Sequence, residues 1–141
     1  MKSDFYSKIY GAGPTGLVIA LAFSKKEHRT LIIDPKPIDE ICSRKRAYAL
    51  TQSSRRLLQD LDVWDQLEQS LSPFNRLTIK DTIHKQSLQL NYSDLTRNNR
   101  HTKFVGWVID HESLMKVLID KVTNSPLIET LFGANTSKEV S

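Results

Sequence analysis

Cysteine and clustered metal ligands are scarce in this chain. The single cysteine, Cys42, excludes an internal disulfide and is typical of a protein from a reducing compartment. The four histidines, at positions 28, 84, 101 and 111, follow no metal-ligand spacing. Neither an H-E-x-x-H nor a G-x-S-x-G pattern occurs, and Cys42 has no partner in sequence that would mark it as a nucleophile. We therefore assign no metal ligand and no catalytic residue to this chain.

Long apolar runs and a strong charge bias are also missing. The longest apolar run, Leu17 to Phe23, is far shorter than the roughly 20 residues that cross a bilayer. No basic and apolar leader precedes residue 8, so we expect no secretory signal and a cytoplasmic location. The net charge of +4 comes from scattered lysines and arginines, which argues against a nucleic-acid partner. A length of 141 residues suits one domain with a real core.

Glycine is sparse too, but its distribution is uneven. Three of the five glycines, at 11, 13 and 16, stand in the stretch KIYGAGPTGLVIALAFSKKEHRTLIID, residues 8–34. The pattern predicts a strand over Phe5–Tyr10, a helix over Pro14–Lys26 and a buried parallel strand over Thr30–Ile33. Residues 5–34 are therefore predicted to form a βαβ unit.

A glycine turn between a strand and a helix is typical of a diphosphate-binding site. Gly11 can make the tight turn, Gly13 can let the backbone approach a pyrophosphate, and Gly16 can let the helix pack closely on the strand. The helix N-terminus then faces the anion, and Asp34, 18 positions beyond Gly16, is placed to accept hydrogen bonds from a ribose. The alternative is a turn that only joins strand to helix. The predicted nucleotide-binding segment comprises Gly11, Ala12, Gly13, Pro14, Thr15, Gly16 and Asp34.

The rest of the chain alternates between helical and strand patterns. Residues 38–50 are interpreted as irregular or partly extended, and Ser53–Leu61 as a helix with Leu57, Leu58 and Leu61 on its apolar face. Ser53 or Ser54 is its expected N-cap, and a second short helix follows at Trp64. Further predicted elements are a hairpin over residues 75–91 with its turn near Asp81–Gln86, a strand over Phe104–Ile109, a helix over Asp110–Val122 and a strand over Leu127–Phe132.

Two later segments carry a family resemblance. The run RAYALTQSSRRLLQDLDVWDQL, residues 46–67, and the run GWVIDHESLMKVL, residues 106–118, resemble the flavoprotein aromatic hydroxylases, and most of all the branch that hydroxylates ubiquinone precursors. The resemblance extends over most of residues 8–122. The chain departs from the family pattern at Thr51 in place of serine, at Asp62 in place of glycine, and at His111 in place of arginine or glutamine.

The resemblance implies a cofactor and a set of contacts. It implies that the glycine turn and Asp34 hold the ADP half of FAD, and that Arg46 reaches the pyrophosphate or the flavin side. His111 stands where the family often places a residue that contacts the cofactor. Two plainer readings stay open at this stage: a solvated basic loop for Arg44–Arg46, and an ordinary helix cap for His111.

The expected fold class is α/β, a Rossmann-like FAD-binding domain with a βαβ start and a parallel sheet. Residues 75–109 would begin an antiparallel substrate-side sheet, and residues 110–132 would return to the FAD-binding domain. The family's Gly-Asp-Ala segment does not occur between residues 123 and 141. The resemblance therefore implies the N-terminal third of a monooxygenase, inactive as this fragment.

In the whole enzyme, the resemblance implies hydroxylation of an aromatic or quinone-type small molecule with NAD(P)H and O2. A prenyl tail on that substrate would place the enzyme at the inner membrane surface. The sequence leaves both this membrane association and the oligomeric state open. Two rival functions also remain: an NAD-binding dehydrogenase or reductase domain, and a non-catalytic fragment that binds a nucleotide or a partner.

Overall fold

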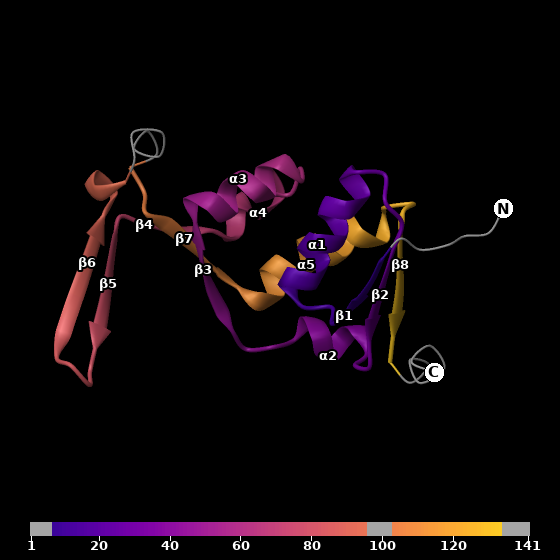
Figure 1. The fold of residues 1–141 in the computed structure, drawn as a ribbon, viewed down its shortest axis with the longest axis horizontal. Helices are drawn as coiled ribbons and strands as arrows, with labels where there is room; N and C mark the ends of the chain where they lie inside the picture. Colours follow the sequence, from indigo (N-terminus) through magenta and orange to yellow (C-terminus); the bar gives the residue numbers. More distant parts are fainter. Residues whose placement is uncertain (1–6, 96–102, 134–141) are drawn as a thin grey trace.

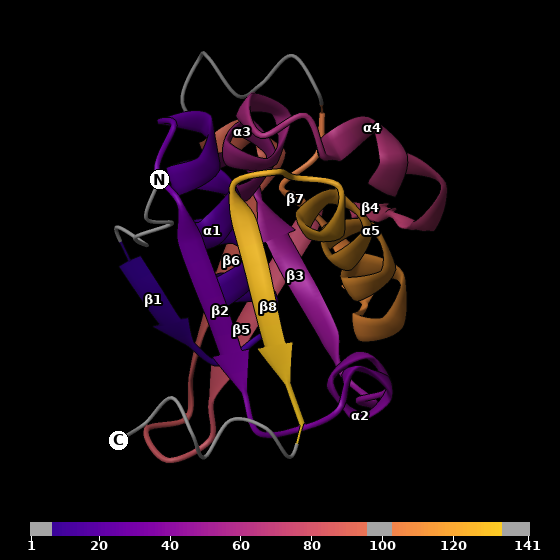
Figure 2. The same cartoon turned by 90° about the vertical axis from the view of Figure 1, so that its right-hand side faces the viewer.

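A parallel sheet forms one layer of the fold. The computed structural model describes residues 7–95 and 103–133, so Phe5 and Tyr6 of the first predicted strand lie outside the described residues. Its strands run in the order β1-β2-β8, all parallel, and the helices α1 and α5 lie side by side against one face of the sheet (Figure 2). The bounds are Ser7–Tyr10 for β1, Thr30–Asp34 for β2, Ile128–Phe132 for β8, Pro14–Lys25 for α1 and His111–Thr123 for α5. The βαβ prediction is confirmed.

The core lies between this sheet and the two helices. Helix α1 starts with proline at its first position, where the missing N–H is not needed, and ends in the cation Lys25. It buries Leu17 and Ala20 completely against Met115 and Leu118 of α5, whose side chains are also fully buried. Burial of one such side chain contributes about 1.5–3 kcal/mol. The two helices therefore fix the carboxyl ends of β1 and β2 in space.

A second, antiparallel sheet has the strand order β3-β7-β4. Residues 38–50 were interpreted as irregular or partly extended. The stretch contains a strand, in agreement with the extended part of that interpretation, and a short helix that was not predicted. The helix has only five residues, too few to display a period of 3.6, and β3 is exposed at every second residue and forms by pairing with β7. The bounds are Ile38–Cys42 for α2, Ala47–Thr51 for β3, Ser72–Phe74 for β4 and Gly106–Asp110 for β7.

Two helices follow β3, and the first of them packs against that strand. The expected N-cap at Ser53 or Ser54 was wrong: Thr51 caps the helix, its Oγ1 accepting a hydrogen bond from the Ser54 N–H. Of the predicted apolar face, Leu58 and Leu61 are buried, whereas Leu57 is 44% exposed. Trp64 meets Trp107 of β7 edge-to-face, with 4.9 Å between ring centroids. The helices are α3 (Gln52–Asp60), α4 (Trp64–Leu67) and the 3-10 turn η1 (Glu68–Ser70).

The predicted hairpin is present and stands away from the body (Figure 1). Strands β5 (Arg76–Asp81) and β6 (Gln86–Asn91) pair in an antiparallel register and are followed by the 3-10 turn η2 (Tyr92–Asp94). Ile79 and Leu88 face each other across the hairpin and are 55% and 64% exposed. The hairpin and β7 belong to different sheets among the described residues. Over the same residues, no helix has the length and apolar character that a bilayer span needs.

Candidate functional site

The carboxyl ends of the three parallel strands meet at one edge of the sheet. The Gly11 N–H, just after β1, donates to the Ile33 carbonyl oxygen at 2.8 Å. The Gly133 N–H, just after β8, donates to the Asp34 carbonyl oxygen at 3.0 Å. Ligands of open α/β sheets bind at this edge. Gly133 has a φ of +86° and was not among the predicted site residues, although a glycine directly after a predicted strand could have indicated it.

Two of the three glycines in the turn are needed for the fold itself. Gly11 has a φ of +108°, which an L side chain rarely adopts. A Cβ atom on Gly16 would overlap the Gly11 carbonyl oxygen and lie 3.3 Å from Cγ2 of Ile9. The tight turn predicted for Gly11 and the close helix–strand packing predicted for Gly16 are therefore both present.

Gly13 differs from its two neighbours. Its backbone torsions, φ −74° and ψ 177°, are open to any residue. A Cβ atom built on Gly13 would meet nothing within 4 Å. Neither backbone strain nor packing therefore requires glycine here, and its effect is to keep open the space in front of the turn.

That open space lies at the N-terminus of α1. The first hydrogen bond of the helix runs from the Leu17 N–H to the Gly13 carbonyl oxygen at 3.1 Å, so the N–H groups of Thr15 and Gly16 have no partner inside the helix. No side chain caps this end, and the first turn holds no acidic residue. The positive end of the helix dipole is thus left for an external anion.

Asp34 lies within one hydrogen bond of the turn. Its carboxylate is 94% buried, with Oδ2 accepting from the Ala12 N–H at 2.8 Å and Oδ1 accepting from the Lys36 N–H at 2.9 Å. Each carboxylate oxygen can accept a second hydrogen bond. The acid is therefore fixed beside the glycine turn and keeps acceptor capacity for a neighbouring hydroxyl group.

The other two predicted site residues are bonded to each other through the backbone, since the His111 N–H donates to the Arg46 carbonyl oxygen at 2.8 Å. Arg46 is exposed in the segment between α2 and β3. The His111 side chain is fully buried, with Nδ1 2.8 Å from the Tyr48 hydroxyl and Nε2 2.7 Å from the Ile41 carbonyl oxygen. Both ring nitrogens are engaged inside the protein and none faces the sheet edge. Tyr48 and Ile41 were not among the predicted site residues, and no local pattern marks them.

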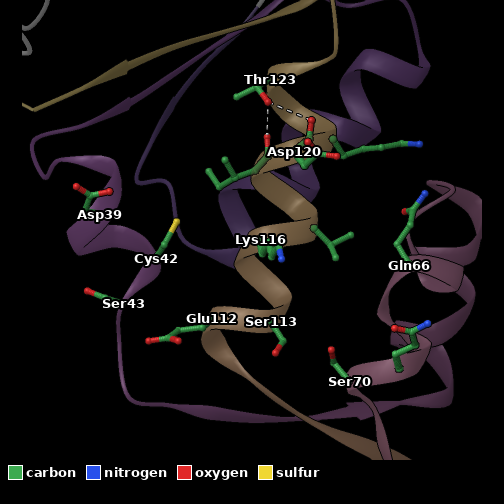
Figure 3. Close-up of a pocket in the computed structure, with 14 residues that line it drawn as sticks. Asp39, Cys42, Ser43, Gln66, Ser70, Glu112, Ser113, Lys116, Asp120 and Thr123 are labelled. Carbon is green, nitrogen blue, oxygen red and sulfur yellow. Dashed lines mark hydrogen bonds between the residues drawn. The ribbon is translucent and has the colours of Figure 1, made fainter.

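A separate groove of about 980 Å³ runs along α5 between α2 and the α4–η1 region (Figure 3). Its wall includes Cys42 and charges of both signs, such as Glu112 and Lys116. Burial, and to a smaller extent the neighbouring Asp39 carboxylate, raises the pKa of the Cys42 thiol. The groove contains none of the predicted nucleotide-binding residues, so it is distinct from the sheet edge.

The parallel sheet, the covering helices and the antiparallel strands define a Rossmann-like α/β fold. Solved structures share it at low sequence identity. The p-nitrophenol 4-monooxygenase PnpA from Pseudomonas putida DLL-E4 aligns with a TM-score of 0.73 and 14% identity, over 94% of this chain and 32% of that one. The probable FAD-dependent monooxygenase pqsL from Pseudomonas aeruginosa aligns with a TM-score of 0.65 and 16% identity, over 89% and 32%. The flavin-dependent monooxygenase PieE, solved with FAD and substrate, aligns with a TM-score of 0.64 and 19% identity, over 90% and 23%.

Sequence comparison adds one curated relative. The uncharacterized protein slr1300 of Synechocystis sp. (strain ATCC 27184 / PCC 6803 / Kazusa) is 25% identical over 126 residues, which are 89% of this chain and 29% of that protein. No family model matches the chain. The chain thus spans less than a third of the length of these relatives and shares the fold of the part of the solved monooxygenases with which it aligns.

Proposed function

We propose that this chain binds the ADP half of FAD at the carboxyl edge of β1, β2 and β8. The observation that carries the proposal is the open space over Gly13, which lies between the uncapped N-terminus of α1 and the fixed carboxylate of Asp34. A diphosphate needs both backbone N–H donors and room for close approach. The residues present therefore fit the group.

Each residue of the turn then has a defined task. The N–H groups of Thr15 and Gly16 donate to the pyrophosphate oxygens, while Asp34 accepts hydrogen bonds from the ribose hydroxyl groups. The carboxylate also disfavours a 2′-phosphate at this position, because two anions would face each other. The exposed guanidinium of Arg46 adds positive charge on the pyrophosphate or flavin side. His111 is left out of this contact set because both its ring nitrogens are engaged elsewhere.

The wider activity that we propose is hydroxylation of an aromatic ring by a longer protein. FAD, when bound, supplies the redox chemistry between NAD(P)H and O2, and the chain described here orients the cofactor. The two motif segments at 46–67 and 106–118 support this activity, as does the fold shared with flavin-dependent monooxygenases. The proposed substrate class is a quinone precursor with a prenyl tail, and it rests on the sequence motifs alone. Such a tail would bring the enzyme into contact with a membrane surface.

Titration calorimetry of the purified chain with FAD, NAD⁺ and ADP tests the cofactor assignment. We expect heat with FAD and with ADP, and weaker binding of NAD⁺. The Gly13→Val variant should bind FAD and ADP at least about ten-fold more weakly, since the valine side chain fills the open space through which the diphosphate approaches the backbone. The matched control, Ser87→Ala on the hairpin, should bind as the parent does.

Two results would contradict the assignment, and they point in different directions. Tighter binding of NAD⁺ than of FAD would favour a dehydrogenase or reductase domain. No heat with any of the three nucleotides would favour a fragment with another binding partner.

A further inference from the structure

We infer that His111 is a positioning residue that holds the segment 41–48 against the start of α5 and thereby sets the place of Arg46. The inference rests on the proposed function, because it gives Arg46 its role toward the cofactor. The sequence predicted a direct contact between His111 and the cofactor. In this inference His111 acts instead through Arg46, by holding the segment that carries it.

Three hydrogen bonds converge on this one residue. The backbone N–H of His111 donates to the Arg46 carbonyl oxygen at 2.8 Å. Its ring binds the Ile41 carbonyl oxygen on one side and the Tyr48 hydroxyl on the other, at 2.7 Å and 2.8 Å. His111 therefore contacts the beginning, the middle and the end of the segment 41–48.

The chemistry of one partner fixes the role of Nε2. A carbonyl oxygen can only accept, so Nε2 carries a proton and donates a hydrogen bond to Ile41. Nδ1 shares the second hydrogen bond with the Tyr48 hydroxyl, a group that can donate or accept. The ring thus joins the last turn of α2, where carbonyl oxygens lack helical partners, to β3.

The middle of the segment is exposed, although Ile41 is buried in the core at one end and Ala47 and Tyr48 pair with β7 at the other. Residues 43, 45, 46 and 47 are exposed, whereas His111 is fully buried and anchored as the first residue of α5, behind the N-cap Asp110. Among the described residues no buried side-chain nitrogen or oxygen lacks a partner. Loss of the ring would therefore leave the Ile41 carbonyl oxygen and the Tyr48 hydroxyl without this partner. The backbone bond from residue 111 to Arg46 would remain, but the segment on both sides of Arg46 would be held less firmly.

A double-mutant cycle tests whether His111 acts through Arg46. We expect His111→Leu and Arg46→Ala each to weaken FAD binding by about ten-fold, and the double variant to lose no more than Arg46→Ala alone. His111→Gln, whose amide can donate to Ile41 and accept from Tyr48, should restore affinity to within about three-fold of the parent. Additive losses, or a failure of glutamine to rescue, would overturn the inference.

Amide hydrogen exchange of the unliganded chain is a second test of the role of His111, and it does not require a cofactor. His111→Leu should speed exchange of the amides in residues 41–48 and leave β1 and β2 unchanged, while His84→Leu on the exposed hairpin should change neither. Faster amide exchange over the whole chain, or no change in residues 41–48, would contradict the positioning role of His111. Tyr48→Phe serves as the milder variant if His111→Leu does not fold, with the same local acceleration expected. If the parent chain binds no FAD and the His111→Leu variant still shows faster exchange in residues 41–48, the proposed function is contradicted, while the role of His111 in holding this segment stands.

Discussion

The Ala12 N–H donates a hydrogen bond of 2.8 Å to Oδ2 of Asp34, across 22 residues of sequence. This bond ties the glycine turn to the end of the neighbouring strand within the buried edge of the sheet. The positive end of α1, which follows β1, and the carboxylate at the end of β2 are thus held beside each other, an arrangement that suits the pyrophosphate and ribose of a nucleotide. Most of the proposed function depends on this relationship.

Asp34→Asn separates the structural from the binding role of the carboxylate. Asparagine has one acceptor oxygen for the two N–H groups, of Ala12 and Lys36, that the carboxylate binds, so we expect the free energy of unfolding to fall by about 1–3 kcal/mol. Affinity for ADP should fall by about ten-fold, because a charged acceptor for the ribose hydroxyls is replaced by a neutral one. Urea unfolding and ADP titration measure the two effects. Unchanged ADP affinity would argue that Asp34 is only a strand-end residue.

The alanine variants of Gly13 and Gly16 should give opposite profiles. Gly13→Ala has space for its methyl group and should cost about 1 kcal/mol or less, the difference between a glycine and an alanine N-cap, while ADP binding weakens. Gly16→Ala overlaps the Gly11 carbonyl and should destabilise the fold by about 1–3 kcal/mol. Thermal unfolding with and without ADP distinguishes them. Equal destabilisation by both variants would contradict the geometry of the turn.

The N-cap of α5 gives a stability effect that depends on pH. Hydrogen bonds from the Ser113 hydroxyl, then from the Ser113 N–H, lower the pKa of Asp110. Since the folded state has the lower pKa, the contribution is complete above about pH 4 and is lost as the pH falls through the folded-state pKa. Asp110→Ala should cost about 1 kcal/mol at pH 7 and less at pH 2–3. A cost that grows toward low pH would refute this cap.

Cys42 should react slowly with alkylating reagents in the folded chain. Burial, and secondarily Asp39, raises its thiol pKa, so little thiolate is present at pH 8. We expect iodoacetamide to label folded Cys42 more slowly than free cysteine, and urea to remove the difference. Asp39→Asn should increase the rate slightly, since it removes only the smaller cause. Labelling as fast as free cysteine would contradict a half-buried thiol on the groove wall.

The elements built from local patterns could be predicted from the sequence. Gly11 and Gly16 carry conformational demands that their spacing indicates, and the apolar period of residues 110–122 predicts the helix α5 closely. The hairpin follows from alternation in β5 and β6, although Ile79 and Leu88 stay exposed, since no described element covers them. These features depend on neighbours in sequence.

The features that escaped prediction depend on distant partners. Strand β3 contains Ala47 and Ala49, which favour strands weakly, and it forms because β7 pairs with it. The ring of His111 contacts residues 63 and 70 positions away, whereas its position at a helix start suggested only a cofactor contact or a helix cap. Thr51 caps α3 because β3 ends there, which a helical period alone does not reveal.

An amide NMR titration of the chain with ADP locates the nucleotide directly. We expect the signals of Gly13, Thr15 and Gly16 to shift most, together with those of Ala12 and Lys36, whose N–H groups bind Asp34. The hairpin signals should stay in place. Shifts confined to the α5 groove, or none in residues 11–16 at saturating ADP, would contradict a nucleotide site at this edge of the sheet.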